Sequence, residues 1–101
     1  MTTKEFSKYF IDNIGRATLV NALNVSDKLY NNDYDVKEFI EECICYISNL
    51  QTSCRIPLEK SSKMLVAFYN CNKDLNSEFK YNKLMVLNDL IISIWEINNG
   101  H

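Results

Sequence analysis

The stretch DVKEFIEECICYISNL, residues 35–50, decides the fold. Its apolar residues recur at i, i+3, i+4, i+7, i+8, i+11 and i+14, which is the period of one face of an α-helix and not that of a strand. At the start of this row, Asp35 and Glu38 have the spacing of a helix N-cap pair. We therefore predict a core helix of about four turns with an acidic face turned toward solvent. The apolar row is Val36, Phe39, Ile40, Cys43, Ile44, Ile47 and Leu50, and the opposite face carries Lys37, Glu38, Glu41, Glu42 and Ser48.

Helical signals also precede this stretch. Thr2 and Glu5 have the spacing of a capping box, and a row of Phe6, Phe10 and Ile14 follows. This first helix is expected to end at Gly15 in the left-handed conformation. Residues 16–23 are predicted as a second, short helix that ends at Asn24, and Ser26 as the cap of a brief helical turn through residue 30.

Two more helices are expected after residue 50. Residues 51–57 are predicted as a loop, and Pro57 is suited to the start of a helix because its missing N–H costs nothing there. A further helix, which ends near residues 70–72, is defined by Leu58, Leu65 and Phe68, with Met64 and Cys71 alongside. The last helix is predicted over residues 78–98, with Leu84, Leu87, Ile91 and Ile94 as its inward row.

Composition agrees with a helical chain. The 101 residues include only two glycines and one proline, whereas an all-β domain needs many turn residues. The length suits one domain with its own core. We predict an all-α fold, a single compact irregular bundle of five to six helices that takes in residues 1–101 as one domain.

Catalytic groups are scarce. The one histidine, His101, is terminal, and Glu41 and Glu42 diverge by about 100° on a helix, so they cannot flank a scissile bond together. The four cysteines, Cys43, Cys45, Cys54 and Cys71, include no CxxC pair, and we expect them to be reduced packing residues. We predict that the chain is not an enzyme and has no catalytic residues, metal ligands or cofactor.

Neither the first residues nor the most apolar segment is expected to act as an export or membrane signal. Residues 1–10 contain charges spread among apolar residues, unlike a signal peptide, and residues 84–97 are too short and too polar to span a bilayer. We therefore expect a cytoplasmic protein with no membrane helix.

Charge is unevenly distributed. The net charge is −2, but residues 33–42 hold five acids against Lys37 alone, whereas residues 55–83 hold six bases against three acids. Nucleic-acid binders normally show a basic excess, so this class is disfavoured.

One string nevertheless resembles a helix-turn-helix, residues 16–32, with residues 24–26 as its turn. Its second helix has Lys28 as its only cation and runs into Asp33 and Asp35, which is the wrong sign to face phosphates. Val20 also occupies a position where the motif usually has a small residue. A small transcriptional regulator that uses this string stays an alternative.

Tyrosines accompany the acids. Tyr30 and Tyr34 flank Asp33, and clustered carboxylates with aromatic rings suit rapid, tight binding of a basic protein surface, because charge steers the encounter and rings anchor it. The predicted partner-binding residues are Tyr30, Asp33, Tyr34, Asp35, Glu38, Glu41 and Glu42.

In length, helicity and acidic helix the chain resembles the small all-helical immunity proteins that neutralise bacterial toxins, of the contact-dependent inhibition or colicin type. Its composition adds to the likeness: residues with AT-rich codons (Asn, Ile, Lys, Tyr, Phe) number 43, a bias common in accessory genes. The resemblance implies a stoichiometric inhibitor that covers the basic active-site surface of a cognate nuclease toxin, as a monomer in a 1:1 complex. A phage protein that binds a host enzyme is a further alternative.

Overall fold

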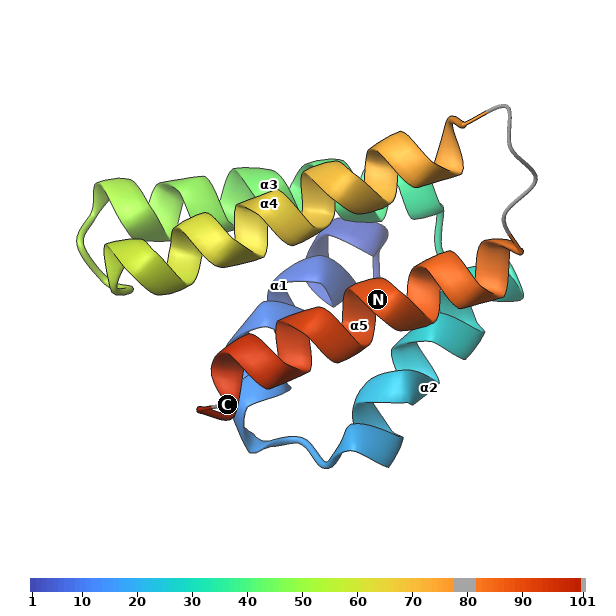
Figure 1. Ribbon diagram of the computed structural model, residues 1–101, viewed down its shortest axis with the longest axis horizontal. Helices are drawn as coiled ribbons and strands as arrows, with labels where there is room; N and C mark the ends of the chain where they lie inside the picture. Colours follow the sequence, from blue (N-terminus) through green and yellow to red (C-terminus); the bar gives the residue numbers. More distant parts are fainter. Residues whose placement is uncertain (78–81, 101) are drawn as a thin grey trace.

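The computed structural model describes residues 1–77 and 82–100, which form an all-α globule of five helices with no strands among them (Figure 1). The α-helices are α1 (Thr3–Asn13), α2 (Leu19–Tyr30), α3 (Val36–Thr52), α4 (Leu58–Leu75) and α5 (Lys83–Asn98), and a 3₁₀ turn, η1 (Ile14–Arg16), follows α1. The radius of gyration is 12.7 Å, close to the about 13 Å expected of a compact chain of this length. The predicted fold class is confirmed.

Several predicted helix ends are confirmed by their caps. The Thr2 side chain accepts a hydrogen bond from the Glu5 N–H, and the Glu5 carboxylate accepts one from the Thr2 N–H, which completes the capping box of α1. The bond that the Glu5 carboxylate accepts from the Thr2 N–H lowers the pKa of Glu5. Asp35 caps α3 by accepting from the Glu38 N–H at 2.8 Å, and Pro57 stands directly before α4.

The predicted break at Asn24 is wrong, because α2 is one continuous helix. Its cap is Thr18, whose hydroxyl accepts from the Asn21 N–H, and Ser26 does not cap a helix but is fully buried. The hydroxyl of Ser26 has no hydrogen-bond partner among the described residues. Ala22, Ser26 and Leu29 form the buried stripe of α2, so packing outweighs the small helix cost of an interior Asn. The expected turn of a helix-turn-helix is therefore not present at residues 24–26.

Other boundaries also differ from the prediction. Gly15 lies within η1 and not in the left-handed region, while α4 continues to Leu75, beyond the predicted end. Leu58, which we used to define α4, is mostly exposed. Helix α5 begins at Lys83 with Asn82 as its cap; the earlier start that we predicted, residues 78–81, lies outside the described residues, as does His101.

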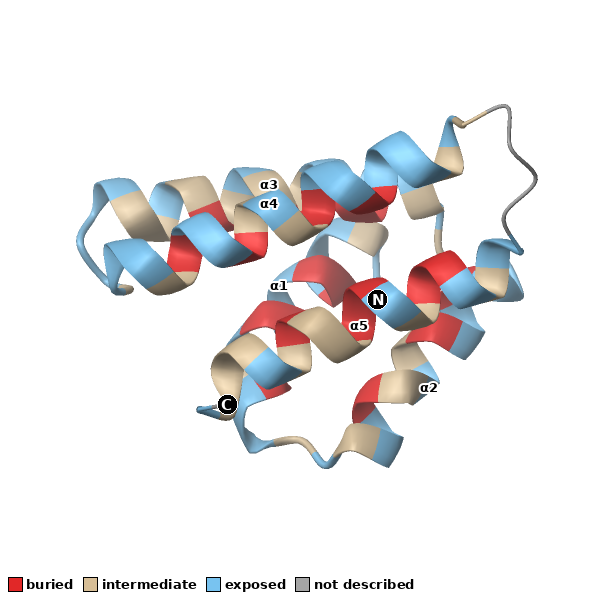
Figure 2. Cartoon of the chain, in the orientation of Figure 1, coloured by how far each residue is buried: buried red, intermediate tan, exposed pale blue. Residues whose placement is uncertain are grey.

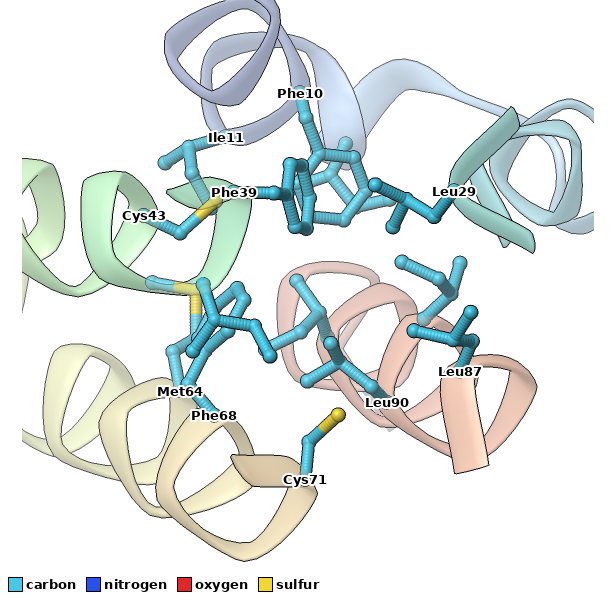
Figure 3. Packing of buried hydrophobic residues seen from close by; sticks show 14 of the residues in the cluster. Phe10, Ile11, Leu29, Phe39, Cys43, Met64, Phe68, Cys71, Leu87 and Leu90 are labelled. Carbon is cyan, nitrogen blue, oxygen red and sulfur yellow. The ribbon is translucent and has the colours of Figure 1, made fainter. Parts of the chain in front are cut away.

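The core centres on Phe39, which is completely buried (Figure 3). Each of the five α-helices contributes buried residues (Figure 2). The ring of Phe39 contacts Phe6 and Phe10 of α1 at centroid distances of 5.7 and 5.6 Å, and Phe68 of α4 at 6.4 Å, all in tilted geometry. Leu29 of α2 and the apolar residues of α5 close the same cluster. One side chain of α3 thus joins helices that are distant in sequence.

Replacing the ring at the centre should be costly. We predict that Phe39→Ala lowers the free energy of unfolding by about 3–5 kcal/mol, because the cavity lies where three helices meet. Tyr69→Ala, which removes an exposed ring on α4, should cost less than about 0.5 kcal/mol. Urea unfolding of both variants measures the difference, and equal losses would contradict the central role of Phe39.

Two helices end in the same motif with different residues. After α2, Asn32 is left-handed at φ 62°, and after α3, Cys54 is left-handed at φ 58°. The following residues, Asp33 and Arg55, each donate to a carbonyl five residues earlier at 2.9 Å, which is the longer bond of a Schellman cap. Asn adopts this conformation more readily than most residues, whereas in Cys the close approach of Cβ to the following carbonyl oxygen is unfavourable.

We therefore predict that Cys54→Gly raises the free energy of unfolding by about 1 kcal/mol, because glycine removes that clash. The matched change Asn32→Gly should give a smaller gain or none. Thermal and urea unfolding under reducing conditions measure both. A Cys54→Gly variant no more stable than the parent would show that the left-handed cysteine carries no strain.

Candidate functional site

An acidic row runs along one edge of α3. Asp35, Glu38 and Glu42 are spaced i, i+3 and i+7, so they share one side of the helix over about 10 Å. Asp35 and Glu38 are exposed and Glu42 is half-buried, while Asp33 is exposed in the turn just before. The structure thus brings four of the five predicted acids onto one end and edge of α3; we call Asp33, Asp35, Glu38 and Glu42 the acidic row.

Within the part of the chain that the structure describes, none of these carboxylates forms an ion pair with a lysine. Among residues 1–77 and 82–100 the one ion pair within 4.0 Å joins Lys63 and Glu59, which are neighbours on α4. Lys4 and Lys8 of α1 line a shallow groove together with Glu42, but neither forms an ion pair with it in that part of the chain. The acidic row therefore presents its charge to solvent.

Glu41 lies beside the row, next to Glu38 at i+3 but on the side away from Glu42. It points about 100° away from Glu42 around α3 and lines a groove of about 530 Å³ between α3 and α4, with Lys37, Tyr69 and Lys83. Among the described residues two cations line this groove beside Glu41, and Lys4 and Lys8 line the groove beside Glu42. Glu41 and Glu42 thus face two different grooves, with Glu38 between them around the helix.

The predicted tyrosines differ in accessibility. Tyr30 is exposed, but the ring of Tyr34 is stacked on Phe6, at 4.0 Å between centroids and 5° between planes. Tyr46 donates a hydrogen bond to the Asp12 carboxylate, and burial together with that bond raises the pKa of Tyr46 to about 12. Of these rings, Tyr30 is the one most available to a partner.

An exposed apolar row on α4 was missed in the sequence. Leu58, Val66 and Tyr69 are 68%, 57% and 58% exposed and face away from the buried Met64 and Phe68. The helical period places Tyr69 opposite the buried stripe, so this outward position could have been read from the spacing. Tyr69 and Glu41 line the same groove, so an aromatic ring lies close to an acid of α3.

The cysteines divide into two pairs. Cys43 and Cys71 are buried packing residues, and burial raises the pKa of each thiol. Cys45 and Cys54 are exposed, so the expectation of a packing role is wrong for them. Within the described ranges no group of three or more His, Cys, Asp or Glu side chains could hold a metal ion.

Comparison with known proteins adds no assignment: no protein family, curated protein or solved structure matches the chain. Among the described residues, no helix is long and apolar enough to cross a membrane. Function must therefore be inferred from the surface itself.

The two tyrosines beside the acidic row allow a test of their different surroundings. We predict that Tyr34→Ser lowers the free energy of unfolding by about 1–3 kcal/mol, because it removes a ring stacked on a core residue. Tyr30→Ser should change it by less than about 0.5 kcal/mol. Chemical denaturation checks both, and a neutral Tyr34→Ser would mean that the Phe6 stack contributes nothing.

Proposed function

We propose that the chain is a stoichiometric protein-binding inhibitor, most concretely an immunity or antitoxin protein that covers the basic surface of a cognate nuclease toxin. The observation that supports this is the acidic row of α3, whose carboxylates have no ion-pair partner among the described residues. Asp35 and Glu38 stabilise the start of α3 as its cap and its first-turn acid, but like charges spaced i, i+3 and i+4 on a helix also repel one another, so the row as a whole is not explained by the fold alone.

The geometry of the row suits recognition. Asp35 is held by its bond to the Glu38 N–H, and Glu38 stands in the first turn of α3, where the helix dipole favours negative charge. Ordered carboxylates lose little freedom when a partner's arginines or lysines dock on them. Their summed field would also accelerate the encounter with a basic protein.

Exposed tyrosines are available near the acids of α3. Tyr30 is exposed where α2 leads into the turn that holds Asp33, and Tyr69 is exposed across the groove from Glu41. Tyrosine combines a large apolar ring with a polar hydroxyl and is enriched among residues that dominate binding energy. We therefore take Tyr30 and Tyr69 as anchors and the acidic row as the steering element.

Co-expression tests the proposal directly. The chain is produced together with the product of the adjacent gene, and growth and complex formation are measured. Rescue from toxicity with a 1:1 complex is the expected result. No rescue and no complex would contradict the proposal, and a 1:1 complex with a host enzyme would favour the phage-inhibitor alternative.

The role of the acidic row is tested by charge reversal in that complex. Glu38→Lys with Glu42→Lys should slow association about tenfold or more and make it less sensitive to salt, because the steering field is reversed. The control, Asp89→Lys with Glu96→Lys, makes the same charge change at exposed positions on α5 and should have little effect. Equal effects of the two double variants on the measured association rate would show that only net charge matters.

A further inference from the structure

The five helices form an open ring. Helix α1 packs on α3, α3 on α4, α4 on α5 and α5 on α2, whereas α1 and α2, the ends of this series, barely contact each other. A groove of about 390 Å³ lies between them. Its floor consists of Phe6, Phe10, Ile14 and Ala22, which belong to the core. These four residues are only 2–5% exposed, so the apolar surface open to a ligand in this groove comes chiefly from Tyr9, Ala17 and Val25, above the edges of the core side chains.

One end of the groove is polar. η1 and a short link join the end of α1 to the start of α2 (Figure 1). Asn13, Arg16 and Asn21, which belong to this junction, line the groove. The Arg16 guanidinium donates a hydrogen bond to the Asn13 side chain at 3.1 Å. The indole N–H of Trp95 on α5 donates to the Ala17 carbonyl at 2.8 Å, which fixes the link in place.

The polar end carries positive charge. Arg16 is the one charged residue that lines the groove, and no described carboxylate lies within ion-pair distance of it. The junction also holds the N-terminus of α2, where the helix dipole is positive and where the first turn contains no acid. This charge is opposite to that of the acidic row, so the two surfaces suit different ligands.

We propose that this groove binds a small apolar molecule with a single anionic group, of the class of medium-chain carboxylates. The carboxylate would pair with Arg16, and the alkyl chain would lie between Tyr9 and Val25, over the edges of Phe6 and Phe10. The volume is within the range of about 300–1,000 Å³ for small-molecule sites and is too small for a docking helix. The inference uses none of the acidic-row residues and does not depend on the proposed function.

The test is a titration of the ¹⁵N-labelled chain with sodium decanoate below its micellar concentration, followed by amide chemical shifts. Saturable shifts at Phe6, Asn13, Arg16 and Ala22 are expected. Shifts that do not saturate, or that spread over exposed apolar positions such as Val66 and Met85, would overturn the proposal.

Variants separate the charged and apolar parts of the site. Arg16→Met keeps the apolar stem and should weaken decanoate binding about tenfold, the loss of one charge-assisted contact, while leaving the weaker binding of decanol unchanged. Arg55→Met, at the chain's other arginine, is the matched control and should have no effect. Asn21→Trp, which covers the groove from an exposed rim position, should abolish binding of both probes. Unchanged decanoate binding in Arg16→Met, equal loss in Arg55→Met, or retained binding in Asn21→Trp would contradict the site.

Discussion

The fold depends on one buried aromatic contact set, the ring of Phe39 against Phe6, Phe10 and Phe68. Aromatic side chains bury large areas and gain further from tilted packing, so they dominate the energetics of a core this small. Since Phe39 lies on α3 while its partners lie on α1 and α4, the cluster makes α3 the helix around which the others assemble. The apolar residues of α5 and Leu29 of α2 then complete the same core (Figure 3).

This arrangement explains both candidate surfaces. Because the inner face of α3 packs in the core, its acidic residues face outward, and the cap bond to Asp35 orders the start of that outer face. The ring of helices begins at α1 and ends at α2, and because both pack on other helices, a seam with an apolar floor stays between them. One surface is acidic and suits a basic protein, whereas the other is apolar with a single cation and suits a small amphiphile.

Much of the fold could be predicted because local signals and packing agree. The period and cap of α3 specify its buried face, and the capping box specifies the start of α1. Prediction failed where packing overrides local preference: Asn24 and Ser26 suggest a break, but burial against α5 keeps α2 continuous. The acids of α3 were predicted from spacing alone, whereas the stack of Tyr34 on Phe6 and the groove near Arg16 arise from contacts between segments far apart in sequence.

Native-state hydrogen exchange tests the central role of α3 most directly. If Phe39 joins the helices, the amides around residues 39–47 should exchange only through global unfolding, with an exchange free energy equal to that from urea denaturation. The amides of α2, which packs mainly on α5 at one end of the ring, should open at lower free energy. Faster exchange in α3 than in α2 would contradict the account, because the helix that we place at the centre would then open before the rest.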